Sequence, residues 1–295
     1  MVSPTVTARP TTSPLKLLWS TNGGPDAFNF PDGLALDRED NLYVTDSGNN
    51  RIQKFDGEGN LITKWGTTGN GDGQLDCEVC GVAVDGQGNV FVTDSNNHRV
   101  QKFDENGKFL AKWGSPGDGD GQFSFPFGIA VDKLGNVYVG DVSNARVQKF
   151  DGNGNFLMKF GGSGTGNGQF SSELADIAVD PVGNIYVSDR ENGLQVFGSD
   201  GQFLAKWDSC GDPQPGLFTA ATGIALDSQG NIYVFDLSNG RMCVFDRQGG
   251  FLKAWYVTTS EGRRLYTVGG VVVDQDGSVY VAGPFDNLVL KLHQR

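Results

Sequence analysis

The chain has 295 residues, of which 38% are apolar and 44 are glycine, and its formal net charge is −12. Glycine is about twice as frequent as the roughly 7% of ordinary proteins, yet the apolar residues suffice for a hydrophobic core. These figures exclude a collagen-like or disordered chain. The acidic balance argues against nucleic-acid binding, which rests mainly on lysine and arginine. Only two histidines are present, so few side chains suit zinc or general base chemistry near pH 7.

Residues 1–14 are rich in threonine and proline and are predicted to form a flexible leader or the remnant of a linker. The chain contains no signal-peptide pattern and no run of the roughly 20 apolar residues that a membrane span needs. We therefore expect no membrane span. We expect a cytoplasmic protein if the chain is complete, and an extracellular one if it is an excised receptor domain.

From residue 15 onward the sequence repeats one unit six times. Each copy begins with the pattern GxxxD, except that the fourth begins with Asp176 in place of glycine. Successive copies are 47 or 48 residues apart. The glycines that begin the other five copies are Gly33, Gly81, Gly128, Gly223 and Gly270.

Every copy contains four short runs rich in valine, isoleucine, tyrosine and phenylalanine, separated by segments of glycine, asparagine and aspartate. This pattern is typical of strands joined by tight turns, because glycine and asparagine accept the positive φ that hairpin turns require. The central run of each copy is apolar on both faces, which indicates a sheet packed between two neighbours. Six such sheets in a ring make a six-bladed β-propeller with four antiparallel strands per blade, an all-β fold.

The two ends of the repeat region predict how the ring closes. The last copy ends at residues 288–292, which match a third strand, and residues 15–19 match the missing fourth strand. We therefore expect the N-terminal strand to complete the last blade, which removes an exposed sheet edge. Residues 15–295 would then form a single propeller domain.

The units resemble NHL repeats over residues 15–292. The resemblance rests on GIAVD, GNVYV, DxxNxRVQKFD and GxGxGQFxxPxG, most completely between Gly114 and Asp151. Propellers of this family serve as RNA-binding or protein-binding platforms, as sensor domains of bacterial kinases and as metal-dependent lyases. The resemblance therefore implies the fold more strongly than any one function.

The tryptophans and several aspartates could suggest a binding or catalytic site, but they recur at the same positions of the six copies, which indicates structural roles. All five tryptophans occupy the same fourth-strand position, with Phe160 in the remaining blade, so we expect them to pack between blades. An aspartate ends the second strand in five copies, and in four of them an arginine follows five residues later, which predicts a structural carboxylate–guanidinium clamp. In blade four, either Arg190 serves as the partner of Asp189 or that carboxylate is free. Blade six lacks both members, having Gly283 and Leu288.

The cysteines and the glycine-rich loops show little sign of metal binding. Loops 69–73 and 117–121 resemble calcium loops, but no bidentate glutamate follows at the required distance. Cys77 and Cys80 form half of a zinc or redox motif, for which we expect a local disulfide or two free thiols. Cys243 is expected only to pack in its strand. No metal and no cofactor are predicted.

The candidate site lies where the six copies differ. In this topology the connections entering each blade share one rim with those joining its second and third strands, and propellers usually bind their ligands there. Exposed aromatic and arginine side chains are typical of binding hot spots. We therefore predict a non-catalytic scaffold, expected to be a monomer, that engages a protein or peptide partner through this set: Asp32, Phe127, Arg190, Phe235, Arg263, Arg264 and Tyr266.

Two alternatives remain open at this stage. The first is a metal-dependent hydrolase or lyase resembling propeller lactonases or the amidating lyase, although His98 and His293 lie outside the repeated strands. The second is an RNA-binding NHL domain, which is less favoured because the rim connections are dominated by aspartate, asparagine and glycine.

Overall fold

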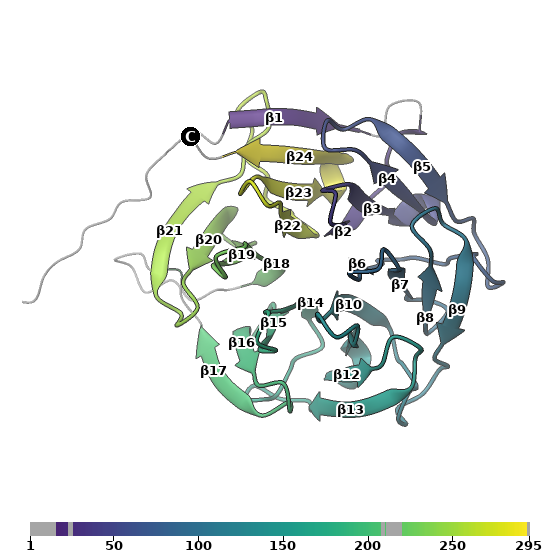
Figure 1. Ribbon diagram of the computed structural model, residues 1–295. Coiled ribbons are helices and arrows are strands. Elements are labelled where there is room, and N and C mark those ends of the chain that lie inside the picture. The colour runs from purple at the N-terminus through teal and green to yellow at the C-terminus, as the bar shows by residue number, and fades with distance from the viewer. Residues whose placement is uncertain (1–15, 23–25, 208–209, 211–219, 294–295) are drawn as a thin grey trace, which may run out of the picture.

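The repeated strands form six separate four-stranded antiparallel sheets that surround a central axis (Figure 1). The structure is a computed structural model that describes residues 16–22, 26–207, 210 and 220–293. Within each sheet the strands follow one another outward from the axis, and neighbouring strands are antiparallel. This confirms the six-bladed propeller. The predicted leader, residues 1–14, lies outside the described residues. No helix in the described ranges is long and apolar enough to cross a membrane.

Blades one to six are numbered here in chain order. Blade one comprises β2 (Pro31–Leu36), β3 (Leu42–Asp46), β4 (Arg51–Phe55) and β5 (Leu61–Trp65). Blade two comprises β6 (Val82–Val84), β7 (Val90–Asp94), β8 (Arg99–Phe103) and β9 (Phe109–Trp113). Blade three comprises β10 (Pro126–Val131), β11 (Val137–Asp141), β12 (Arg146–Phe150) and β13 (Phe156–Gly161).

Blade four comprises β14 (Leu174–Val179), β15 (Ile185–Asp189), β16 (Gly193–Phe197) and β17 (Phe203–Trp207). Blade five comprises β18 (Ala221–Leu226), β19 (Ile232–Asp236), β20 (Arg241–Phe245) and β21 (Phe251–Tyr256). Blade six comprises β22 (Val271–Val273), β23 (Val279–Gly283), β24 (Leu288–His293) and the N-terminal β1 (Lys16–Thr21). Three single-turn 3-10 helices join second to third strands: η2 (Ser47–Asn49), η3 (Val142–Asn144) and η4 (Pro284–Asp286).

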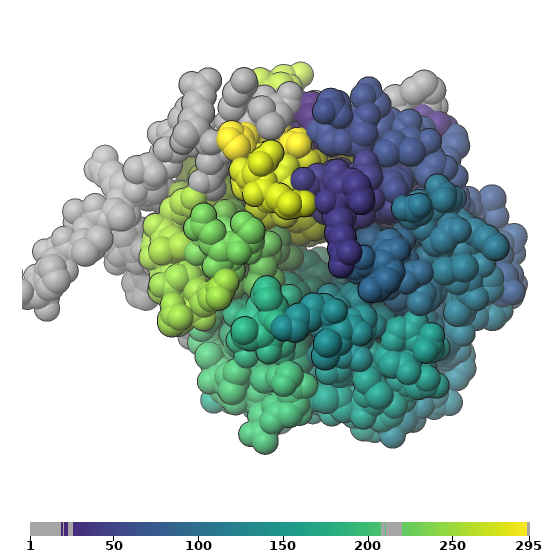
Figure 2. Space-filling model, in the orientation of Figure 1, coloured from purple at the N-terminus to yellow at the C-terminus, as the bar shows by residue number. Residues whose placement is uncertain are grey.

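The N-terminal strand closes the ring as predicted. β1 pairs antiparallel with β24, with Trp19 opposite Lys291. Figure 1 shows β1 along the outer side of β24. In the space-filling view, the purple and blue residues of blade one lie beside the yellow residues of blade six (Figure 2). The two ends of the repeat region therefore share one sheet, and blade six has no free outer edge at β24.

The hydrophobic core consists of layers between adjacent blades. All five residues are buried in the second strand of every blade, because each such strand is covered on both faces. Trp65 shows the predicted tryptophan packing: its ring contacts Tyr43 of its own blade at a centroid distance of 6.2 Å and Phe103 of the next blade at 6.0 Å. The ring of tryptophans therefore joins neighbouring blades.

The aspartate–arginine clamps are present where they were predicted. In blade two, Arg99 Nε donates to Asp94 Oδ2 at 2.7 Å, and the remaining guanidinium nitrogens donate to the carbonyl oxygens of Asn70 and Gly71 in the loop that enters the blade. In blades one, two and three the clamp therefore joins a hairpin to the entering loop, since Arg51 and Arg146 also donate to loop carbonyl oxygens. In blade two, the carbonyls of the calcium-like loop bind a guanidinium. The other three clamps are Asp46–Arg51, Asp141–Arg146 and Asp236–Arg241.

In blade four, Asp189 is neither paired with Arg190 nor free, the two states that were predicted for it. This carboxylate is fully buried and accepts hydrogen bonds from the amide and hydroxyl of Ser171 at 2.6 and 2.7 Å. Arg190 instead forms an exposed ion pair with Glu173 at 3.3 Å. A serine in the entering loop thus replaces the arginine of the third strand, where the chain has Gly193.

All four cysteines are oxidised. Cys77 and Cys80 form a disulfide, which was one of the two expected states. The expectation that Cys243 only packs is wrong, because it forms a disulfide with Cys210. In the corresponding position of blade two, Gln101 donates to the carbonyl oxygen of Gln74 in the entering loop. Cys243 contacts the same loop of blade five, but through a covalent bond.

Candidate functional site

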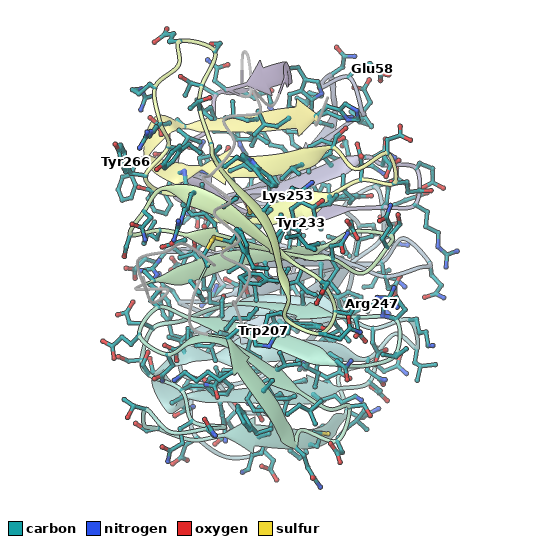
Figure 3. All side chains as sticks on the ribbon, turned by 90° about the vertical axis from the view of Figure 1, so that its left-hand side faces the viewer. Glu58, Trp207, Tyr233, Arg247, Lys253 and Tyr266 are labelled. Atoms are coloured by element: carbon teal, nitrogen blue, oxygen red, sulfur yellow. A yellow bond between two sulfur atoms is a disulfide. The ribbon has the colours of Figure 1, made fainter. Side chains whose placement is uncertain are left out.

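A cavity of about 980 Å³ follows the axis and is lined mainly by the first strands of the blades. It opens at the rim formed by the connections that enter the blades and those that join second to third strands, called the entry rim here. The opposite rim, called the turn rim, carries the hairpin turns. Figure 3 shows Tyr266 at the entry rim, and Glu58 and Arg247 at the turn rim.

Aromatic side chains surround the mouth of this cavity. Phe285 is 72% exposed and Tyr266 is 62% exposed, and both line the opening. The ring of Phe30 lies edge-on to Phe285 at a centroid distance of 5.3 Å. Phe30 and Phe125, each followed by a proline, have φ of 56° and 64°, a left-handed conformation that bulky residues rarely adopt. Such backbone strain persists only where the surrounding structure imposes it, and it is frequent at functional sites.

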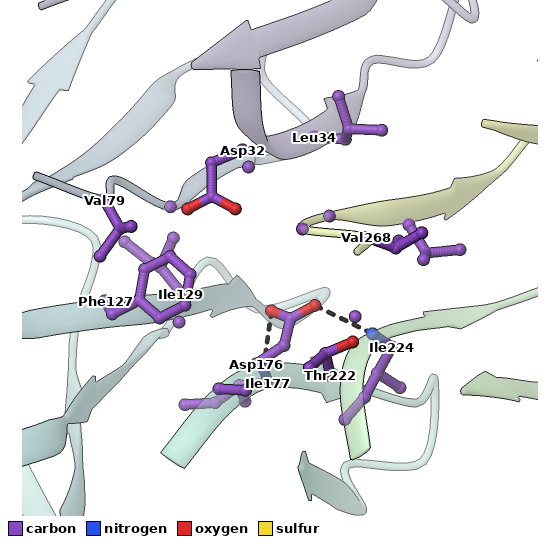
Figure 4. Close-up of a pocket in the computed structure, with 18 of the residues that line it drawn as sticks. Asp32, Leu34, Val79, Phe127, Ile129, Asp176, Ile177, Thr222, Ile224 and Val268 are labelled. Atoms are coloured by element: carbon purple, nitrogen blue, oxygen red, sulfur yellow. Dashed lines mark hydrogen bonds between the residues drawn. The ribbon is translucent and has the colours of Figure 1, made fainter. Parts of the chain in front are cut away.

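Two carboxylates face one another inside the cavity. Asp32 lies on β2 of blade one and Asp176 on β14 of blade four, so they extend from opposite sides of the ring. Figure 4 shows both side chains pointing into the pocket, with Phe127 beside Asp32 and Thr222 beside Asp176. The arrangement is an acidic pair within largely apolar walls.

The two carboxylates have different hydrogen-bond environments. Asp176 accepts hydrogen bonds from the backbone amides of Ile177 at 2.8 Å and Ile224 at 2.9 Å, the second from the neighbouring blade. Asp32 is only 4% exposed, and its Oδ2 has no hydrogen-bond partner among the described residues. Thr222 is 3% exposed, and its Oγ1 likewise lacks a partner there.

Burial makes both carboxyl groups weak acids. Desolvation and, to a smaller extent, the charge of Asp176 raise the pKa of Asp32 to about 7, although the Arg190 charge opposes the increase. Desolvation also raises the pKa of Asp176 to about 7, against the two amide hydrogen bonds, which favour its ionised form. Near neutral pH both carboxyl groups are therefore partly protonated, and the charge of Asp176 disfavours ionisation of Asp32.

The repeat contained a signal for Asp176 that sequence reasoning did not use. In the other copies a glycine occupies this position because the first strands approach one another closely around the axis. A Cβ atom at Gly223, for example, would lie 2.4 Å from the carbonyl oxygen of Gly269. Asp176, which stands in place of this glycine, therefore places a side chain in the channel that the other copies lack at this position. Phe30, Phe125 and Thr222 were also absent from the predicted set.

Four of the seven predicted site residues line the cavity, namely Asp32, Phe127, Arg190 and Tyr266. The loop that carries Tyr266 also contains two other predicted residues, Arg263 and Arg264, which do not line the cavity. Arg263 pairs with Asp286 of η4 at 2.5 Å, and the guanidinium of Arg264 lies 3.5 Å from the ring centroid of Tyr256. These two arginines hold the loop in place beside the mouth.

Phe235 is not a rim residue, which corrects the prediction. Its side chain is fully buried in the layer between blades five and six and is not part of the cavity lining. The equivalent residue of blade two is Thr93, which is also fully buried. The residue before the clamp aspartate therefore faces the core, and a large apolar side chain there fills the interior.

The cavity offers few ligands for a metal ion. Its lining contains neither of the two histidines. Across the described ranges, no three side chains among histidine, cysteine, aspartate and glutamate come together as a metal site. The interior of the cavity combines the carboxylates of Asp32 and Asp176 with a threonine hydroxyl and apolar walls, and the lining also includes Glu78, Glu173 and Arg190.

Comparisons with known proteins support the architecture. A family profile described as NHL repeat matches residues 28–55, 80–103 and 123–150. No curated protein matches the sequence. Similar solved structures include a virginiamycin B lyase from Staphylococcus aureus, with 12% identity, 95% of this chain and 99% of that chain covered, and a TM-score of 0.64. A gluconolactonase from Xanthomonas campestris is 18% identical, with 97% and 92% covered and a TM-score of 0.64. At these identities the likeness concerns the fold alone.

Proposed function

We propose that this chain, a six-bladed β-propeller in which NHL repeats match at three places, is a non-catalytic scaffold whose entry rim binds a peptide segment of a protein partner. The observation that carries the proposal is the exposed aromatic mouth above the cavity. Phe285 and Tyr266 are the most exposed aromatic side chains among the large exposed apolar residues of the described chain. Aromatic side chains over a pocket are the usual anchors of protein interfaces.

The charges near the mouth support a peptide rather than a nucleic acid as partner. Arg190 is paired with Glu173, and Arg263 is paired with Asp286, so two of the rim arginines already have carboxylate partners. Glu78 adds a further acidic side chain to the cavity lining. A phosphate backbone would meet net negative charge here, whereas a peptide with apolar and basic residues would find complementary surfaces.

Peptides selected from a random library on the immobilised protein test this proposal. We expect the double variant Phe285→Ala and Tyr266→Ala to lose about tenfold or more in affinity for the selected peptides, because hot-spot aromatics carry most of the binding energy. The matched control removes two exposed apolar side chains of the turn rim, Leu134→Ala and Val182→Ala, which are 79% and 74% exposed. Equal losses in both double variants, or none in the first, would refute the entry rim as the binding surface.

A second candidate is an enzyme acting on a small molecule in the cavity. The observation in its favour is the pair Asp32 and Asp176, since carboxyl groups with a pKa of about 7 suit general acid and base catalysis at neutral pH. The virginiamycin B lyase and the gluconolactonase with this fold are enzymes, which raises the same question for this chain. Stoichiometric zinc or calcium in protein purified without chelator, together with lactone hydrolysis abolished by Asp176→Asn, would favour this candidate over the scaffold.

A further inference from the structure

The interior of the cavity contains polar atoms that the described protein leaves unpaired. Asp32 Oδ2 and Thr222 Oγ1 both lack hydrogen-bond partners there, although both side chains are more than nine-tenths buried. Buried polar atoms without partners destabilise a fold and are rare in native proteins. Two of them on one cavity, both aimed inward (Figure 4), indicate a ligand that supplies hydrogen-bond donors.

The backbone around Asp32 is shaped to hold its carboxylate. A Cβ atom at Gly269 would lie 2.1 Å from Asp32 Oδ1, so only glycine allows this approach of the neighbouring blade. The amide of Gly270 donates to the carbonyl oxygen of Asp32 at 2.7 Å, which fixes the main chain beside the carboxylate. The main chain of Asp32 is thus fixed, and the close approach of Gly269 limits where its carboxylate can lie.

Apolar groups surround the acidic pair. Val79, Phe127 and Ile129 line one side of the pocket, and Val268 lies across from them (Figure 4). The charged residues of the lining are four acids and a single base: Asp32, Glu78, Glu173, Asp176 and Arg190. The single base is already paired with Glu173 at the mouth. The cavity therefore combines an excess of negative charge with apolar walls.

We propose that the pair formed by Asp32 and Asp176 binds an organic cation, an ammonium or guanidinium group carried on an apolar body. This inference rests on the proposed function, in which the cation is the lysine or arginine side chain of the bound peptide. The N–H groups of the cation donate to Asp32 Oδ2 and Thr222 Oγ1, and its charge balances the two carboxylates. The face of Phe127 adds a cation–π contact, and the adjacent carbon atoms pack on Val268.

The donor set suits an organic cation better than a divalent metal ion. Calcium takes six to eight oxygen ligands and magnesium requires six in near-octahedral geometry. Here the oxygens of Asp176 already accept two amide hydrogen bonds, and the surrounding side chains are mainly apolar. An alkylammonium group needs only three acceptors and benefits from the apolar walls.

Isothermal titration calorimetry with small probes and blocked peptides tests the inference. The amine probe is 2-phenylethylammonium and its neutral control is 2-phenylethanol. The peptide probe is acetyl-Phe-Lys-Phe-amide and its control has norleucine in place of lysine. We expect both cations to bind at pH 8 at least tenfold more tightly than their neutral controls, because charge-assisted hydrogen bonds are worth about that much.

Variants of the acidic pair identify where the cation binds. Asp32→Asn and Asp176→Asn should each weaken the amine by about tenfold, whereas Glu58→Gln, which removes an equal charge from the turn rim, should leave its affinity unchanged. Wild-type affinity should also increase between pH 6 and pH 8 as the two carboxyl groups ionise. Thermal unfolding of each variant establishes that it is folded.

The outcomes separate this inference from the proposed function. Equal binding of the lysine and norleucine peptides would overturn the cation site and leave the entry rim as a peptide surface. Binding of the free amine without binding of either peptide would support the cation site and count against the peptide scaffold. Tight calcium or zinc binding that displaces the amine and is lost in Asp32→Asn would replace the organic cation by a metal ion.

Discussion

The buried carboxyl group of Asp32 should make the stability of the fold depend on pH. Its pKa is raised from the ordinary 3.8 to about 7. In the unfolded chain this group loses its proton near pH 4, while in the folded protein it keeps the proton until about pH 7. The folded state therefore binds more protons across this window, and stability must fall as the pH rises through it. Below pH 4 the group contributes no penalty.

The size of the effect follows from the shift. About three pH units at ~1.36 kcal/mol each give a full penalty of ~4 kcal/mol well above pH 7, of which ~2–3 kcal/mol accrues between pH 5 and pH 8. Asp32→Asn removes the ionisation and keeps the shape of the side chain. Relative to the wild type, the variant should therefore gain ~2–3 kcal/mol on going from pH 5 to pH 8.

Urea unfolding measured from pH 4 to pH 9 provides the test. Any constant effect of the buried amide shifts the whole curve of the variant, so the informative quantity is the slope against pH and not the value at one pH. Glu58→Gln changes the net charge equally at the turn rim and should run parallel to the wild type. Parallel curves for Asp32→Asn and the wild type would refute the raised pKa and, with it, the description of the cavity as a desolvated acidic site.

Two further predictions concern the framework of the ring. Arg99→Ala leaves the fully buried carboxylate of Asp94 without its ion pair and should lower the free energy of unfolding by ~3–5 kcal/mol in urea denaturation, whereas loss of the exposed Arg190 should lower it by under ~1 kcal/mol; similar values would contradict the clamp. Replacing Cys210 and Cys243 by serine opens a loop closed across a separation of 33 residues and should lower stability by ~3–4 kcal/mol, seen as a lower Tm in calorimetry; an unchanged Tm would show that the disulfide does not contribute.

The architecture was predictable because each of its determinants recurs six times. A single tryptophan suggests little, but Trp65 and its equivalents at one position of successive units indicate a layer between blades. The clamp was predictable for the same reason. Blade six has Gly283 in place of the aspartate and Leu288 in place of the arginine, so it lacks both members of the pair, and these two residues lie opposite one another in β23 and β24. Repetition turns weak local signals into a definite register.

The error at Phe235 arose because a residue that departs from the repeat was taken to be exposed. Phe235 departs from the repeat in type, but its position is buried in the other blades as well, so its size is accommodated in the core. The same comparison explains Cys243, whose equivalent glutamines donate to the entering loop and thereby show which segment it can reach. The position of a residue in the blade determines whether its side chain is buried, whereas the residue type determines only which side chain occupies that position.

The acidic pair is the part of the site that the sequence indicated least clearly. Asp32 was selected as one divergent rim residue, but its counterpart Asp176 lies 144 positions later, and only the closed ring places them face to face. Their raised pKa depends on the apolar walls contributed by several blades, including Phe127 and Val268. Such a property belongs to the assembled channel and has no local signature in the chain.

Site-specific photo-crosslinking tests the central claim, that the entry rim is the binding surface, most directly. A benzophenone side chain introduced at Phe285 lies at the mouth of the cavity, and one introduced at Leu134 lies in a turn at the opposite rim; both positions are more than 70% exposed. With a peptide selected on the wild-type protein, we predict a covalent adduct from position 285 and none from position 134. An adduct from position 134 without one from position 285 would contradict binding at the entry rim.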